Sequence, residues 1–85
     1  MQDFRNKIDS IDEQILMLLK ERFDIAKSIG HIKKQSKTPV IFDPIREKEI
    51  LNNLKSKKLL DDIIIDEIWK EILYLSRCVQ KDIIT

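Results

Sequence analysis

The first third of the chain carries a seam of hydrophobic residues with the period of an α-helix. Its apolar members follow one another at steps of 4, 3, 4, 3, 7, 4 and 3 residues, and they are Phe4, Ile8, Ile11, Ile15, Leu18, Ile25, Ile29 and Ile32. This spacing predicts one helix from about Asp3 to about Lys34. Such a helix would be about 45 Å long at roughly 1.5 Å per residue. Because that is too long for 85 residues folded alone, we expect a partner along its full length.

A second, shorter helix is predicted after a loop. Residues 35–39 have the sequence Gln-Ser-Lys-Thr-Pro, which is typical of a loop. Asp43 suits the N-cap of the following helix, and Pro44 suits its first position. The helical pattern then continues to about Lys57, with apolar residues Ile50, Leu51 and Leu54.

A third helix is predicted in the last part of the chain. Asp61 or Asp62 caps it, and it runs to about Ile83. Its apolar face comprises Ile65, Ile68, Trp69, Ile72, Leu73, Leu75 and Val79. Strand signals are absent, because there is neither sustained alternation nor an Asn-Gly or Asp-Gly turn. We therefore predict an all-α fold of one long, one short and one medium helix, forming a single domain over residues 1–85.

Composition restricts how so small a domain can be stabilised. The chain has one cysteine, Cys78, and one histidine, His31, so neither an internal disulfide nor a zinc cluster is expected. Self-association is the remaining route. The net charge of +1 gives no reason to expect nucleic acid. No apolar run reaches the length of a membrane span or a signal peptide, and with the lone thiol this favours the cytoplasm.

A charged residue interrupts the seam of the long helix. Arg22 lies four residues after Leu18 and three before Ile25, where a charge is costly unless it is paired. Lys33 returns to nearly the same face eleven residues later, and Ala26 and Gly30 lie between the two cations. One interpretation is a trough for an anion with a floor of small side chains. The alternatives are a snorkelling or ion-paired Arg22, and a glycine that lets another helix pack closely or ends the helix early.

Polar residues also enter the other two predicted helices. Trp69, Leu73, Ser76 and Gln80 share one stripe, so the Ser76 and Gln80 side chains can reach one ligand, unless the stripe already faces solvent. The second helix opens with Asp43, Arg46 and Glu47. A helix N-terminus is a suitable site for a carboxylate, although a solvated first turn is the simpler interpretation.

Arg5 suggests that two chains share one site. It precedes Arg22 by seventeen residues, which is about 25 Å along a straight helix. If both arginines bind the same small ligand, they must come from different chains. An exposed arginine near a frayed terminus is the alternative.

Together these residues resemble the all-helical, AroQ-class chorismate mutases. The similarity runs from Arg5-Asn6-Lys7-Ile8-Asp9-Ser10-Ile11-Asp12 through Ile15–Leu19, Arg22, Ala26, Gly30 and Lys33, and it resumes with Asp43-Pro44-Ile45-Arg46-Glu47, Ser76 and Gln80. The resemblance implies an intertwined, six-helix homodimer with two equivalent active sites. It also implies conversion of chorismate to prephenate, in phenylalanine and tyrosine biosynthesis, without cofactor or metal. One departure is the segment Val40-Ile41-Phe42, which is one residue longer than the usual family spacing.

The resemblance also implies a role for each site residue. Arg22 and the Arg5 side chain of the other chain would grip the substrate carboxylates. Lys33 and Gln80 would donate to the breaking ether oxygen, and Glu47 would accept from the ring hydroxyl. Ser76 and the backbone at Asp43 would bind the ring carboxylate, with Arg46 as a supporting contact. Three alternatives remain open: an isochorismate pyruvate-lyase on the same fold, a non-catalytic helical dimerisation module that binds a metabolite, and a plain coiled-coil adaptor without a ligand site.

Overall fold

The computed structural model describes residues 1–85 as three α-helices without a strand. Helix α1 spans Gln2–Lys34, α2 spans Pro44–Ser56 and α3 spans Asp62–Ile84. The predicted all-α class and the long, short and medium helices are confirmed, and each predicted boundary lies within one or two residues of the observed one. Helix α1 continues through Gly30, so the early end that glycine could have caused does not occur.

The helix ends form where the sequence supplies the right local chemistry. The Asp43 carboxylate accepts a hydrogen bond of 3.0 Å from the backbone N–H of Arg46, and Pro44 follows at the first helical position. Asp61 is the N-cap residue of α3, but its side chain accepts no capping hydrogen bond. Between α2 and α3 the chain reverses at Lys58, whose φ of 58° lies in the left-handed region. The loop between α1 and α2 therefore ends in a well-capped turn, which fixes the direction of α2.

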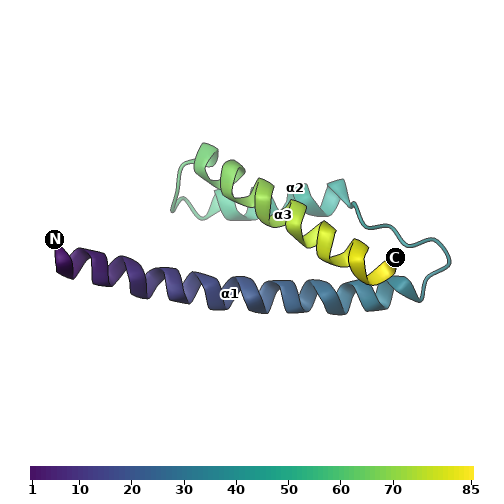
Figure 1. The fold of residues 1–85 in the computed structure, drawn as a ribbon. Helices are drawn as coiled ribbons and strands as arrows, with labels where there is room; N and C mark the ends of the chain where they lie inside the picture. Colours follow the sequence, from purple (N-terminus) through teal and green to yellow (C-terminus); the bar gives the residue numbers. More distant parts are fainter.

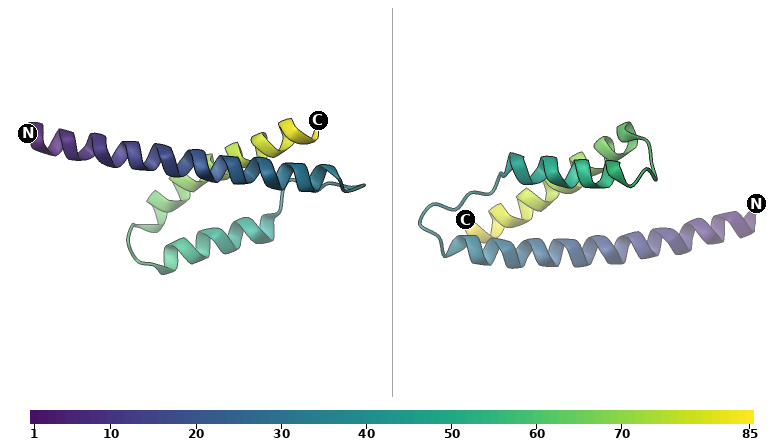
Figure 2. Two further views of the ribbon diagram at one scale, coloured as in Figure 1. Left: turned by 90° about the horizontal axis from the view of Figure 1, so that it is seen from below. Right: turned by 180° about the vertical axis from the view of Figure 1, so that it is seen from behind.

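Helix α3 packs against both of the other helices, and in Figure 1 it runs diagonally from the level of α2 toward the C-terminal end of α1. The packing of α3 is more extensive against α1, whose C-terminal half lies beside it, than against α2. The N-terminal part of α1 extends beyond both of them, and the same arrangement is visible from below and from behind (Figure 2). The molecule is consequently elongated, with principal dimensions of 55 × 24 × 15 Å.

The core of this single chain is small. Only six of the 85 residues are buried, namely Ala26, Gly30, Ile65, Leu73, Ser76 and Gln80. The hydrophobic seam of α1 remains 40–71% exposed at every apolar position from Phe4 to Ile32. Ile68 and Leu75, which belong to the predicted apolar face of α3, are also 45% exposed. None of the three helices combines the length and apolar character needed to cross a membrane.

Candidate functional site

A cavity of about 340 Å³ lies where the three helices meet. Its polar lining consists of Arg22, Lys33, Asp43, Arg46, Glu47, Ser76, Arg77 and Gln80, and its apolar lining of Ile25, Ala26, Ile29, Ile41, Ile50 and Leu73. Seven of the eight predicted site residues thus surround one space. The eighth, Arg5, lies outside it on the projecting part of α1.

Helix α1 supplies one wall of this cavity along the predicted trough, of which Arg22, Ala26 and Lys33 line the cavity and Gly30 does not. Arg22 and Lys33 are half-buried at its two ends, and Ala26 and Gly30 are buried between them. A Cβ atom on Gly30 would lie 3.2 Å from the Cα of Gln80 and 3.2 Å from the Cβ of Ile83. Gly30 therefore allows α3 to approach α1 closely, as one of the sequence interpretations proposed. This close approach brings Gln80 level with Lys33.

The guanidinium of Arg22 crosses from α1 to α3. Its Nη1 atom donates a hydrogen bond of 2.6 Å to the Ser76 hydroxyl, and no carboxylate lies within ion-pair distance of it. Burial lowers the pKa of Arg22 below its ordinary value, and repulsion from the nearby Arg46 lowers it further. Arg22 is therefore a partly desolvated cation without a counter-ion, which an anionic ligand would stabilise.

Lys33 and Gln80 form a second link between the same helices. The Lys33 ammonium donates a hydrogen bond of 2.9 Å to the Gln80 side-chain oxygen, and Lys33 also lacks a carboxylate partner. Gln80 is buried, so the stripe of Ser76 and Gln80 faces α1 and not solvent. Because the amide oxygen is occupied, the amide nitrogen and the remaining ammonium hydrogens are free to donate to a common acceptor in the cavity.

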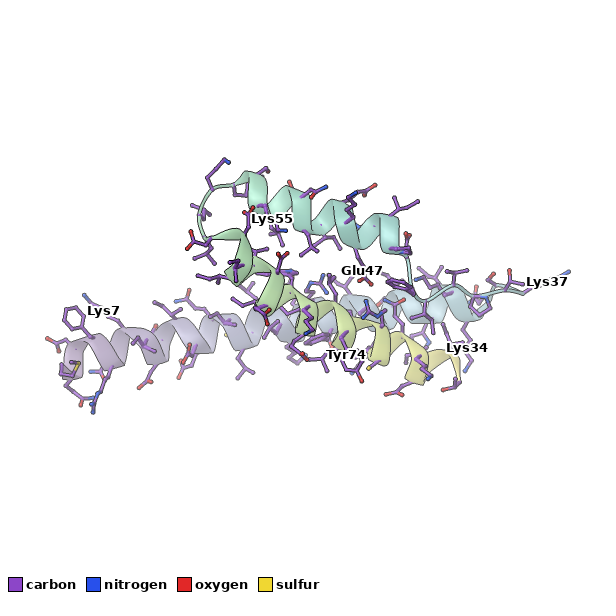
Figure 3. The ribbon with its side chains drawn as sticks, turned by 90° about the horizontal axis from the view of Figure 1, so that it is seen from above. Lys7, Lys34, Lys37, Glu47, Lys55 and Tyr74 are labelled. Carbon is purple, nitrogen blue, oxygen red and sulfur yellow. The ribbon has the colours of Figure 1, made fainter.

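Helix α2 contributes its first turn. The Asp43 carboxylate is engaged as the helix cap. Arg46 forms an ion pair of 3.4 Å with Glu49, and both side chains are largely exposed, which matches the interpretation of a solvated turn for Arg46. Glu47 is different, because it faces α1 and α3 (Figure 3).

Sequence reasoning missed the partner of Glu47. Arg77 of α3 donates from Nη1 to both carboxylate oxygens of Glu47 at 2.5 Å, and it also lines the cavity. The signal was present in the sequence, since Arg77 lies four residues after Leu73 and three before Gln80 and so shares their side of the helix. Nothing in the sequence, however, showed that this side would meet Glu47.

The chemistry of the cavity points to an anionic ligand and a reaction without covalent catalysis. Arg22 and Lys33 offer charged donors that lack carboxylate partners. No histidine or cysteine lines the cavity. Its only hydroxyl side chain, that of Ser76, accepts from a cation and has no base beside it. No group of three or more His, Cys, Asp or Glu side chains is placed to hold a metal ion. Such a site suits binding, orientation and stabilisation of negative charge.

Comparison with known proteins assigns the chain to a family. The family model described as chorismate mutase type II matches residues 4–81. The chain is 43% identical over 65 residues to a chorismate mutase of Methanocaldococcus jannaschii, an alignment that covers 76% of this chain and 63% of the relative. It is 36% identical over 89 residues to a bifunctional chorismate mutase/prephenate dehydratase of Aquifex aeolicus, covering 98% of this chain and 24% of the relative.

A similar bifunctional protein of Neisseria gonorrhoeae is 35% identical over 77 residues, covering 88% of this chain and 20% of the relative. The chain thus spans a quarter or less of these bifunctional relatives and less than two thirds of the M. jannaschii protein. No solved structure gives a significant match. Because the family model matches nearly the whole sequence, the chain belongs to the chorismate mutase type II family.

Proposed function

We propose that residues 1–85 act as one chorismate mutase domain, which converts chorismate to prephenate by an intramolecular [3,3] rearrangement. The observation that carries the proposal is the convergence of Arg22, Lys33 and Gln80 in one cavity, with both cations free of carboxylate partners. The names of the relatives support the same activity. The reaction needs no nucleophile, since one C–O bond breaks and one C–C bond forms within the substrate.

Binding of the two substrate carboxylates holds the side chain over the ring. Arg22 forms a charge-assisted pair with one carboxylate, together with Arg5 of the partner subunit. The Ser76 hydroxyl accepts from Arg22 and so keeps its own proton available for the ring carboxylate, which the backbone at Asp43 also binds. Arg46 supports this binding from the rim. Orientation of this kind is worth several kcal/mol of the barrier.

Lys33 and Gln80 stabilise the transition state. Negative charge develops on the ether oxygen as the C–O bond breaks, and the Lys33 ammonium and the Gln80 amide nitrogen donate to it. The hydrogen bond between them orients the amide before substrate arrives, so little reorganisation is needed during the reaction. Glu47 accepts a hydrogen bond from the ring hydroxyl and fixes the position of the ring.

The functional unit is a homodimer in which each site uses both chains. The single chain exposes 7160 Å² of surface, whereas a compact monomer of its mass exposes about 5,300 Å². The excess is within the range that each subunit buries in an obligate dimer, and the exposed seam of α1 accounts for much of it. Since α1 is one unbroken helix, Arg5 lies about 25 Å from Arg22 of its own chain and reaches a substrate only in the partner's site.

Mixing two inactive variants tests the shared site. Chains carrying Arg5→Ala and chains carrying Arg22→Ala are purified separately, unfolded together and refolded as a mixture. Each mixed dimer then contains one site with both native arginines and one site with neither. Random pairing restores about a quarter of the wild-type activity in the mixture, whereas sites built from one chain restore none. Light scattering measures the mass of each variant as a control for dimerisation.

The activity itself is tested by adding chorismate to the purified protein and identifying the product. Prephenate is the expected product. Isochorismate is offered in a parallel reaction, because release of pyruvate from it would indicate the lyase activity instead. Failure to consume either substrate, with the dimer intact, would favour a non-catalytic binding module and refute the proposal.

A further inference from the structure

Arg77 is the one ionic residue of the cavity that has no role in the proposed chemistry. It lies on α3 between Ser76 and Gln80, and its side chain lines the cavity beside Glu47. Its contacts connect three segments of the chain: α3, the first turn of α2 and the loop before α2. The role of Arg77 is therefore sought in the groups that it holds in place, above all the Glu47 carboxylate.

The pair formed by Arg77 and Glu47 is tight and largely shielded from solvent. Nη1 of Arg77 lies 2.5 Å from both carboxylate oxygens, and the two side chains are 30% and 20% exposed. The neighbouring pair of Arg46 and Glu49 is longer, at 3.4 Å, and its side chains are more than 60% exposed. The carboxylate of Glu47 is thus fixed by two hydrogen bonds from one cation, and it is far less screened than a surface pair.

The ring of Phe42 also contacts the same guanidinium. The centre of its ring lies 5.1 Å from the Cζ atom of Arg77, which is within the range of a cation–π contact. Phe42 belongs to the segment Val40-Ile41-Phe42 that departs from the usual family spacing, and Ile41 of this segment lines the cavity. Arg77 therefore joins the lengthened loop, the first turn of α2 and the middle of α3.

The charge of Arg77 has a direct consequence for a dianionic ligand. A lone Glu47 carboxylate facing the cavity would repel a substrate with two carboxylates. Arg77 balances that charge, so that Glu47 can accept a hydrogen bond without weakening substrate binding. The four cations and two carboxylates of the lining then give the cavity an excess of two positive charges from this chain, which balances the two negative charges of the ligand.

We propose that Arg77 is a positioning residue that orients the Glu47 carboxylate for the ring hydroxyl of the substrate and compensates its charge, with Phe42 holding the guanidinium in place. This inference rests on the proposed function. It predicts an effect on substrate binding that passes through Glu47, because Arg77 does not itself need to touch the substrate.

A double-mutant cycle on the full-length dimer tests the inference. Steady-state kinetics with chorismate are measured for wild type, Arg77→Met, Glu47→Gln and the double variant. Removal of two charge-assisted hydrogen bonds and the charge balance raises KM about tenfold or more in Arg77→Met, with a smaller decrease in kcat. In the Glu47→Gln background the neutral amide no longer repels the ligand, so Arg77→Met changes KM less than about twofold. Arg77→Lys, which restores the charge without the planar fork, recovers much of the KM.

Lys55 provides a matched control. It forms an ion pair of 2.7 Å with Asp66, which joins the same two helices at their other end, away from the cavity (Figure 3). Lys55→Met removes this link between α2 and α3 and leaves KM unchanged. Melting curves of all variants report any loss of folded dimer.

Three results would overturn the inference. An equal effect of Arg77→Met in both Glu47 backgrounds would mean that Arg77 acts independently of Glu47. A similar rise in KM in Lys55→Met would mean that any link between α2 and α3 suffices. A wild-type protein that does not turn over chorismate would refute both this inference and the proposed function, whereas an active wild type with additive effects would refute only the role of Arg77.

Discussion

Arg22→Met should separate ligand binding from stability, because Arg22 has no carboxylate partner in the structure. The methionine retains an apolar stem of similar length and removes the guanidinium. Two charge-assisted hydrogen bonds to a substrate carboxylate are worth about 3 kcal/mol or more in total. We therefore expect kcat/KM for chorismate to fall by about a hundredfold or more.

The same substitution should change the stability of the ligand-free protein only slightly. It removes the hydrogen bond from the charged Arg22 guanidinium to Ser76, which costs about 1.5 kcal/mol or more. It also removes a partly desolvated cation that repulsion from Arg46 destabilises further. Since these effects oppose each other, we expect the Tm to remain within about 6 °C of wild type.

A thermal shift assay completes this prediction. Prephenate at about a hundred times its Kd should raise the Tm of wild type by about 10 °C and leave that of Arg22→Met almost unchanged. Lys20→Met is the control, because it removes an exposed cation of α1 that pairs only with Asp24, and it should behave as wild type in both assays. Normal turnover by Arg22→Met would show that Arg22 is not the carboxylate-binding cation. Collapse of its dimer without ligand would contradict the small effect on stability.

Three further predictions concern other parts of the site. Gly30→Ala should lower kcat severalfold, because the new Cβ would lie 3.2 Å from the Cα of Gln80 and displace this residue. The Tm should change little, because a gain of about 1 kcal/mol in helix propensity offsets this crowding. A fully active variant in the chorismate assay would contradict the prediction. Asp43→Ala should destabilise the dimer by about 1 kcal/mol, because the Arg46 N–H loses its capping acceptor, whereas Asp43→Asn retains the capping hydrogen bond. Equal denaturation midpoints for the two variants would exclude capping as the cause. Turnover should be nearly constant from about pH 5 to about pH 8, because the amide of Gln80 does not titrate and no histidine or cysteine lines the cavity. A steep loss of kcat across this range, with the dimer intact, would argue against Gln80 as the donor to the ether oxygen.

The sequence by itself determined the three helices and the position of their apolar faces. The period of the seam set the length of α1, and the Asp43-Pro44 pair set the start of α2. These features are local, because capping and periodicity act over a few residues. Local patterns also identified half of the polar lining of the cavity, since Arg22, Lys33, Ser76 and Gln80 each stand out as polar residues on an otherwise apolar stripe.

Only the tertiary structure decided which polar residues meet. The sequence places Arg77 on the same side of α3 as Leu73 and Gln80, but its pairing with Glu47 depends on how α2 packs against α3. The cavity contact of Ile41 and the packing of Phe42 on Arg77 likewise depend on the path of a loop that has no periodic pattern. Contacts between residues thirty or more positions apart follow from helix packing, which local sequence patterns do not encode.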